Sequence, residues 1–217
     1  DCGPACISLS QDIQGQTFDY PEDFFKEKIH AIRRPRPDEF QIKEAAEKIK
    51  ASKNPIIISG GGVFYSNAME ELSKFAIKHN IPVTQTVMGY STMKRDHSHY
   101  AGQIGALGGK NTNSLAKQTD LAIAVGTKLA DFTTGSWTNF ENENFKLVSI
   151  NVSRFDANKH LAQAVVGDAR ASLNELSAAL GDWKAPDEWN NKSQIELKTW
   201  NEHVDKESAP TNQEVPS

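Results

Sequence analysis

Three consecutive glycines, Gly60, Gly61 and Gly62, follow the apolar run PIIIS and are candidate phosphate-binding residues. In an open α/β sheet, ligands collect beyond the carboxyl ends of the strands, where glycines let backbone N–H groups approach a phosphate. The dinucleotide pattern G-x-G-x-x-G is incomplete, because its last glycine falls on Tyr65. The acid expected on a ribose about 20 residues later is also absent, since residues 84–86 read TQT. An ordinary NAD dehydrogenase is therefore disfavoured, and two interpretations stay open: a nucleotide site, or a tight turn without a ligand.

Other polar groups offer weaker signals. The segment GALGGKN around Lys110 misses the phosphate-loop pattern G-x-x-x-x-G-K-[ST] at Ile104 and Asn111. His97 and His99 have a spacing that metal ligands can have, but alternating histidines in a polar loop are more often solvated. No Ser-His-Asp arrangement follows from residue order alone, so we assign no catalytic residue and no metal ligand. Carboxylates at predicted strand ends serve either as catalytic groups or as turn and cap residues, and here they are Asp120, Asp131, Asp156 and Asp168.

Alternating strands and helices must position these residues. Five short apolar runs bounded by turn residues predict buried strands: PIIIS, IPVTQT, DLAIAVG, FKLVSINV and AVVGD. Helical periodicity recurs between them, over residues 39–54, 68–80 and 169–180. This alternation predicts an α/β fold with a Rossmann-like, doubly wound parallel sheet. We also expect a strand at 5–10 and a helix at 187–206, whose tryptophans need a surface outside the main core.

Composition limits the classes of function. The chain has 217 residues, 38% hydrophobic and 24% charged, which is enough for one sizeable core. Lys plus Arg number 24 and Asp plus Glu 28, so the net charge of 24 − 28 = −4 gives no general reason to bind nucleic acid. No apolar run approaches the roughly 20 residues that span a bilayer, and no secretory signal is visible. We expect a cytoplasmic protein, and the start without Met, inside an apolar alternation, predicts a piece of a longer chain.

Six segments occur in a recognisable order: GPACISLSQDIQ, NPIIISGGGV, IPVTQTVMGYSTMKRDHSHYAGQIGALGG, TDLAIAVGTKLADF, LVSINVSRFDANK and VVGDARASL. Together they resemble the central domain of thiamine-diphosphate dependent enzymes of the acetohydroxyacid synthase and pyruvate decarboxylase type. The match covers nearly the whole chain, so it is more specific than one glycine motif. It implies that residues 1–15 end a pyrimidine-binding domain, 16–37 are a linker, 38–183 form the Rossmann-like central domain, and 184–217 lead toward a missing diphosphate-binding domain.

The resemblance implies that the parent enzyme uses thiamine diphosphate and magnesium, neither of which this chain would bind. In the family, a thiazolium ylid attacks or stabilises carbon next to a carbonyl, and the protein supplies orientation and electrostatics. The activating glutamate and the Gly-Asp-Gly motif with its paired asparagines belong to the other two domains; the nearest echo here is Val166-Gly167-Asp168-Ala169. The implied partners are those two domains and further copies of the parent chain. We expect the isolated chain to be inactive.

Relatives whose central domain carries FAD or an adenine nucleotide provide candidate binding positions. Their loops match Gly60, Gly61, Gly62, Met88, Gly89, Gly126, Lys128, Asn151, Gly167 and Asp168 of this chain. The flavin pattern is broken, because Lys128 stands where an arginine is usual and Asn151 and Ser153 replace an acidic pair. Ala130 and Phe132 also replace polar or charged residues. FAD is therefore disfavoured, an adenine nucleotide stays open, and an empty, structural crevice is favoured.

The segment SQDIQGQTFDYPEDFFKEKIHAIRRPRP narrows the resemblance to the trihydroxycyclohexane-1,2-dione hydrolases, the ring-opening enzymes of inositol catabolism. It implies that the parent cleaves a carbon–carbon bond in a cyclic diketone. Three alternatives stay open. One is an acetolactate synthase-like or decarboxylating enzyme, and another is a stand-alone adenine-nucleotide-binding module. The third is an NAD-consuming deacylase, which would need His97 or His99 near the cofactor crevice.

Overall fold

The computed structural model describes residues 5–29 and 31–209, and the chain divides into two units, Asp1–Arg33 and Arg34–Ser217. The described part of the first unit holds two short helices, α1 (Gln11–Gln14) and η1 (Glu22–Phe24). The strand expected at 5–10 was a wrong prediction, because these residues have no regular structure. A strand needs a neighbour to pair its N–H and C=O groups, and the described part of this unit provides none.

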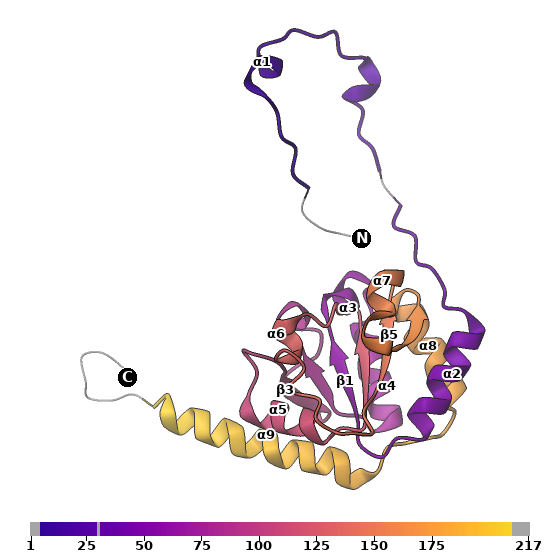
Figure 1. Cartoon of the computed structure of the whole chain (residues 1–217), viewed down its shortest axis with the longest axis vertical. Helices are drawn as coiled ribbons and strands as arrows, with labels where there is room; N and C mark the ends of the chain where they lie inside the picture. Colours follow the sequence, from indigo (N-terminus) through magenta and orange to yellow (C-terminus); the bar gives the residue numbers. More distant parts are fainter. Residues whose placement is uncertain (1–4, 30, 210–217) are drawn as a thin grey trace. The chain divides into compact units, whose positions relative to one another are not determined.

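The second unit is built on a six-stranded sheet in the order β3-β2-β1-β4-β5-β6, with every neighbouring pair parallel (Figure 1). The strands are β1 (Pro55–Ser59), β2 (Val83–Gln85), β3 (Tyr100–Gln103), β4 (Leu121–Val125), β5 (Lys146–Asn151) and β6 (Gln163–Val166). This is the strand order of dinucleotide-binding α/β folds, so the predicted fold class is confirmed. Five of the strands were predicted, and β3 was missed.

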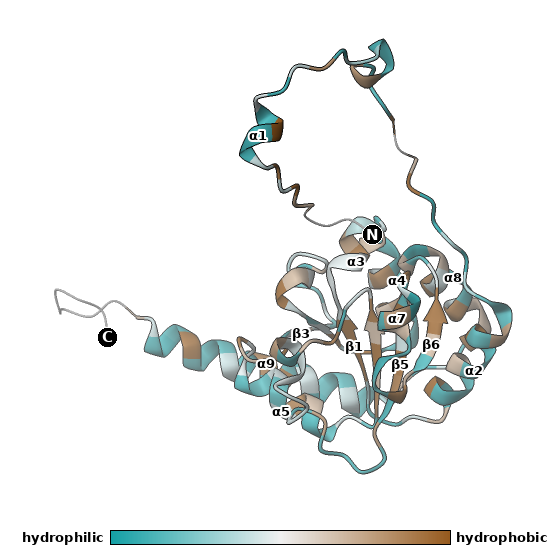
Figure 2. Cartoon of the chain, turned by 45° about the horizontal axis from the view of Figure 1, so that its top comes forward, coloured by the Kyte–Doolittle hydropathy of each residue, from teal (hydrophilic) through white to brown (hydrophobic). Residues whose placement is uncertain are grey.

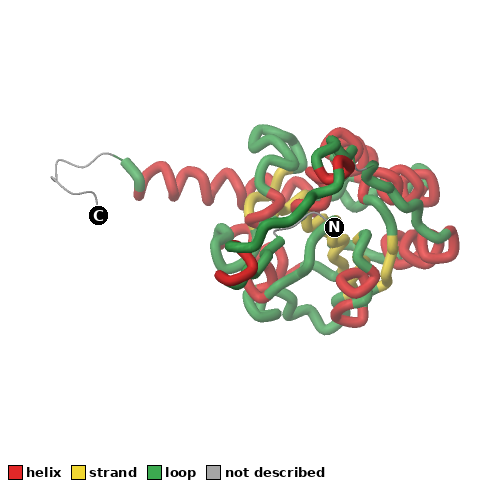
Figure 3. Tube along the Cα trace, turned by 90° about the horizontal axis from the view of Figure 1, so that it is seen from above, coloured by secondary structure: helices red, strands yellow, loops and turns green. Residues whose placement is uncertain are grey.

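Helices cover both faces of the sheet. They are α2 (Glu39–Lys50), α3 (Gly61–Tyr65), α4 (Met69–His79), α5 (Lys110–Gln118), α6 (Asp131–Thr134), α7 (Arg154–Ala157), α8 (Ala169–Leu180) and α9 (Asp187–Glu207), with single turns η2 (Val87–Gly89) and η3 (Lys159–Leu161). None of the helices in the described part is both long and apolar enough to cross a membrane. Figure 2 shows apolar strands enclosed by helices that turn hydrophilic residues outward, and Figure 3 shows α9 reaching away from the sheet.

Side chains along each strand point alternately to the two faces of the sheet, so the core is divided into two layers. Ile57 of β1 packs with α2, α4 and α8 on one face, whereas Ile56 and Ile58 pack with α5 and α9 on the other. Successive strand side chains point to opposite faces, so a fully apolar run such as PIIIS is what a sheet covered on both sides requires. Helix α2 follows its sequence signals, because the Asp38 side chain accepts hydrogen bonds from the backbone N–H groups of Phe40 and Gln41.

Helix α9 corrects a second expectation. Trp189 does not need a surface outside this unit: only 4% of it is exposed, and it packs in the layer beside α5. Its indole Nε1 donates to the Pro55 carbonyl at 2.7 Å, which ties the start of α9 to the start of β1. Farther along, the Trp200 indole lies against Gly109, so this unit also supplies the neighbour of the second tryptophan.

Candidate functional site

The candidate crevice lies at the carboxyl ends of β1 and β4. Strand order reverses between these two neighbours, which is where ligands collect in open α/β sheets. The loop after β1 carries Gly60 to Gly62, the loop after β2 carries Met88 and Gly89, and the loop after β4 carries Gly126 and Lys128. The topology therefore brings these predicted positions to one edge of the sheet (Figure 1).

The glycines of the first and fourth loops pack backbone against backbone. The Gly62 N–H donates to the Gly126 carbonyl at 2.9 Å, and the Gly60 N–H donates to the Val125 carbonyl at 2.9 Å. A Cβ on Gly62 would lie 2.6 Å from the Gly126 Cα, and one on Gly60 would lie 2.3 Å from the Gly126 carbonyl oxygen. Gly126 also has a positive φ of 60°, a conformation that favours glycine. Close approach of the two loops thus accounts for these glycines without a ligand.

The loop after β2 closes the crevice from the other side. A Cβ on Gly89 would lie 2.0 Å from the Ser59 carbonyl oxygen, and one on Gly61 would lie 3.1 Å from the Met88 carbonyl. The buried Ser59 and Thr92 hydroxyls are 2.6 Å apart, and the Thr92 hydroxyl donates to the Gly89 carbonyl at 2.7 Å. This hydrogen-bonded network holds the loop over the end of β1. The Met88 side chain points into solvent, with 73% of the residue exposed.

Asn151 links the ends of β4 and β5. Its Nδ2 donates to the Thr127 carbonyl at 3.1 Å, and its Oδ1 accepts from the Ser153 backbone N–H at 3.0 Å. Both ends of this amide are thus used inside the protein, which is what burial of a polar side chain requires. Lys128, two residues after Gly126, is exposed.

Asp168 caps helix α8 and forms an ion pair. Its carboxylate accepts from the backbone N–H groups of Arg170 and Ala171, and the Arg34 guanidinium donates to it at 3.0 Å. Arg34 lies 3.4 Å from the Tyr65 carbonyl oxygen as well, so it connects α8 to the end of α3. The adjacent Gly167 donates its N–H to the Asn151 carbonyl at 3.0 Å. The sequence placed Arg34 in a linker, and nothing in its neighbourhood indicated this partner.

A second missed pair joins α4 to α8. The Arg170 Nε donates to Glu71 Oε1 at 2.7 Å, and Glu71 is 9% exposed. Its other oxygen, Oε2, has no hydrogen-bond partner among the described residues. No spacing signal in the sequence links these residues, because they are 99 positions apart and meet only when the two helices pack.

The histidine candidates lie at the opposite edge of the sheet. His97 and His99 precede β3, whose first residue pairs with the start of β2. Burial lowers the pKa of both imidazoles. The His99 backbone N–H donates to His97 Nδ1 at 3.1 Å, so the neutral ring carries its proton on Nε2 and donates to the Ser73 hydroxyl at 2.8 Å. A ring in that tautomer does not take the serine proton, and neither histidine adjoins the crevice that a deacylase would use.

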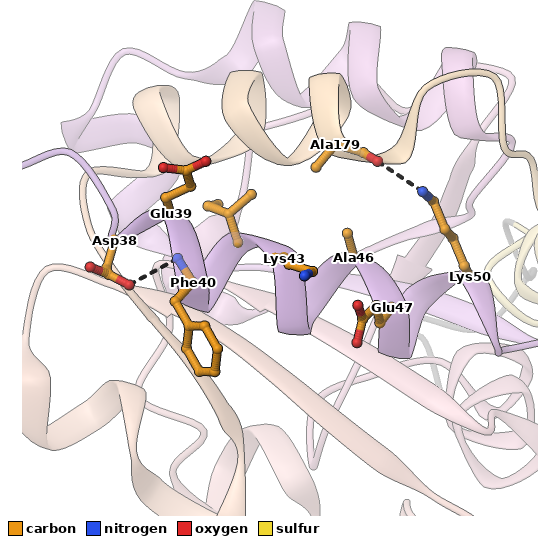
Figure 4. Close-up of a pocket in the computed structure, with 9 residues that line it drawn as sticks. Asp38, Glu39, Phe40, Lys43, Ala46, Glu47, Lys50 and Ala179 are labelled. Carbon is orange, nitrogen blue, oxygen red and sulfur yellow. Dashed lines mark hydrogen bonds between the residues drawn. The ribbon is translucent and has the colours of Figure 1, made fainter.

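A groove of about 720 Å³ runs along the outer side of α2 and α8 (Figure 4). Two of its polar groups have partners: Asp38 caps α2, and the Lys50 ammonium donates to the Ala179 carbonyl at 2.9 Å. Phe40 points to the other side of α2 in this view. The groove contains no arrangement of acid, base and nucleophile, so it does not compete with the carboxyl edge as a site.

The ten predicted positions thus lie along one edge, where the Asn151 and Asp168 side chains are bonded within the protein and Lys128 is exposed. The family model for the thiamine pyrophosphate enzyme central domain matches residues 42–176, more than half of the chain. The chain belongs to this family. The match spans the strands β1 to β6 and the crevice between β1 and β4. The expected resemblance to a thiamine-diphosphate enzyme central domain is therefore confirmed.

Curated relatives narrow the likeness within the thiamine pyrophosphate enzymes. The chain is 40% identical over 204 residues to the 3D-(3,5/4)-trihydroxycyclohexane-1,2-dione hydrolase of Clostridium perfringens (strain 13 / Type A), covering 94% of this chain and 32% of the relative. The chain is 46% identical over 180 residues to the enzyme of the same name from Clostridium botulinum (strain Alaska E43 / Type E3), and this match covers 83% of this chain and 28% of the relative. The chain is 39% identical over 206 residues to the enzyme of the same name from Geobacillus thermodenitrificans (strain NG80-2), and this match covers 95% of this chain and 32% of the relative. The chain spans about a third of the length of these relatives.

The described residues do not fit the metal that accompanies thiamine diphosphate. Among residues 5–29 and 31–209, no three His, Cys, Asp or Glu side chains gather as a metal site would require. The Gly-Asp-Gly motif is absent from the sequence, and the carboxylate of Asp168 in its nearest echo is held by α8 and Arg34. We therefore assign no step of thiamine chemistry to these side chains.

Proposed function

We propose that the chain is the central domain of a longer thiamine-diphosphate dependent hydrolase, which cleaves a carbon–carbon bond of a trihydroxycyclohexane-1,2-dione in inositol breakdown. The observation that carries the proposal is the extent of the match. Identity of 39–40% continues over 204 to 206 residues, whereas the family domain accounts for residues 42–176. The match therefore takes in segments beside the shared domain, where the sequence first suggested this group.

In the proposed enzyme, this chain has a structural role. Its two packed layers and its ion pairs fix the position of the carboxyl edge, while thiamine diphosphate, magnesium and the reacting carbons are held by the remaining two thirds of the parent. The isolated chain should consequently be inactive. Use of magnesium, assembly of the parent into a homo-oligomer and a cytoplasmic location stay predictions.

The test is an assay of the full-length parent protein with thiamine diphosphate and magnesium, using the cyclic dione and pyruvate as separate substrates. We expect ring opening of the dione and no turnover of pyruvate. The 217-residue chain, assayed in parallel, should turn over neither substrate. Turnover of pyruvate alone would reject the proposal in favour of an acetolactate synthase-like or decarboxylating enzyme, and turnover by the isolated chain would reject its structural role.

A further inference from the structure

Large apolar side chains gather at the carboxyl edge of the sheet, in the loops after five consecutive strands of the chain. We call six of them the carboxyl-edge belt: Phe64, Tyr65, Met88, Leu107, Phe132 and Phe155. They are between 55% and 77% exposed. Figure 1 places α3, α6 and α7, which carry four of the six, together at this edge. Exposed apolar side chains that gather on one side of a domain are typical of interaction sites.

The loops that carry the belt are firmly connected to each other. The Ala106 N–H donates to the Phe132 carbonyl at 2.7 Å, which joins the loop after β3 to the loop after β4. Gly61 lies against Met88, and Gly62 is bonded to Gly126, which joins the loops after β1, β2 and β4. The belt residues in these loops are therefore carried on a connected backbone framework. The Gly62 N–H, which could otherwise approach a phosphate, already has a partner in the Gly126 carbonyl.

Positive charge accompanies the belt. Lys128, in the loop after β4, and Arg154, at the start of α7, are exposed at this edge. No carboxylate of the described residues lies within ion-pair distance of Lys128 or Arg154. The exposed Asp131 supplies an opposing charge, and Asp156 of α7 is paired with Lys159 at 2.6 Å. The chain as a whole carries −4, so this edge departs from the average charge. An acidic partner surface would complement it.

The polypeptide also enters the second unit at this edge. The Asp168 N–H donates to the Pro35 carbonyl at 2.8 Å, and Arg34 forms its ion pair with Asp168 beside it. The relatives extend over about three times the length that matches this chain. A large part of the parent is therefore available to cover the belt.

We propose that the carboxyl-edge belt is the docking surface for a protein surface of the parent chain outside residues 1–217. That surface carries apolar side chains together with carboxylates that face Lys128 and Arg154. The proposal rests on the proposed function only in requiring a longer parent. It assigns a protein partner to the edge for which an adenine nucleotide was left open, with Lys128 as a charge contact.

The experiment compares acetylation of lysines in the 217-residue chain and in the full-length protein by mass spectrometry. We expect Lys128 to react about tenfold more slowly in the full-length protein, because a packed interface excludes the reagent. Lys43 on α2 and Lys74 on α4 are the matched controls, and their rates should agree within about twofold. Equal reactivity of Lys128 in both proteins would overturn the proposal.

Other occupants give distinct outcomes. Protection of Lys128 in the isolated chain by ATP or FAD would make the belt a ligand site, and protection in a sedimenting dimer of the isolated chain would make it a contact between copies. Either result overturns the proposal. If the full-length protein turns over the dione but Lys128 is not protected, the docking proposal is rejected and the proposed function is retained. If Lys128 is protected but the dione is not turned over, the proposed function is rejected and the docking proposal is retained.

A charge-reversal variant tests the electrostatic part. In the full-length protein, peroxide oxidation of Met88 should be slow, and the double variant Lys128→Glu, Arg154→Glu should accelerate it about tenfold because like charges then face each other. The matched control Lys43→Glu should leave the Met88 oxidation rate unchanged. Slow oxidation of Met88 in the double variant would contradict an acidic partner.

Discussion

The substitution Gly126→Ala tests whether the glycines of the crevice serve close packing. The added Cβ would lie 2.5 Å from the Gly62 Cα and 2.8 Å from the Gly62 carbonyl carbon, which are backbone atoms that cannot rotate away. Forcing atoms into a packed site costs about 1–3 kcal/mol, and a left-handed conformation costs an L-residue about 1–2 kcal/mol. We therefore expect Gly126→Ala to lower the free energy of unfolding by about 2–5 kcal/mol, a large share of the ~5–15 kcal/mol typical of domains.

Gly135→Ala is the matched control, because Gly135 has nearly the same φ, 58°, but its Cβ would meet only side-chain atoms at 3.1 Å or more. Gly135→Ala should lower the free energy of unfolding only by the cost of the left-handed conformation, about 1–2 kcal/mol. The assay is urea unfolding of the 217-residue chain. If Gly126→Ala abolishes folding, Gly62→Ala offers a milder test of the same contact, with about 1–3 kcal/mol expected. Losses for Gly126→Ala and Gly62→Ala no greater than that of Gly135→Ala would refute the packing argument.

Three further outcomes are expected. Burial lowers the pKa of His79 below its ordinary value, so its share of the free energy of unfolding is fully present above about pH 6.5 and is lost as the pH falls through the folded pKa. Urea unfolding at several pH values should show a flatter pH dependence of the free energy of unfolding for His79→Gln than for the wild type; equal slopes for the two proteins would contradict this. Trp189→Phe removes the donor to the Pro55 carbonyl and should lower the free energy of unfolding by about 1–3 kcal/mol, so an unchanged urea midpoint would be evidence against that contact. Calorimetry of the isolated chain with ATP, NAD and FAD should show no micromolar binding, and a micromolar dissociation constant would restore the nucleotide module.

Strands buried on both faces were predictable because their own sequence, apolar throughout, identifies them without knowledge of the rest of the fold. Runs such as PIIIS and LAIAV are apolar throughout, and each became a fully buried strand. Strand β3 was missed because its sequence, YAGQ, is short and contains glycine and glutamine. It lies at the edge of the sheet, where only β2 pairs with it and fewer apolar residues are required.

The candidate site was predictable in position but not in its internal bonds. Loops after parallel strands must meet at one edge, so the clustering of Gly60, Gly89 and Gly126 follows from the strand pattern alone. What occupies the space between them does not follow. The bonds from Asn151 to Thr127 and from Arg34 to Asp168 join residues 24 and 134 positions apart, and they depend on the twist and packing of the finished sheet.

Helix α9 continues past the last residue that it packs on the sheet. Residues 201–207 are fully helical and exposed, beyond Trp200 and its contact with Gly109. An α-helix turns by about 100° and advances by about 1.5 Å with each residue. Deleting a single residue after Trp200 would therefore swing any segment attached to Glu207 through more than a quarter of a circle, so the number of residues in this part of α9 sets the direction in which the chain departs.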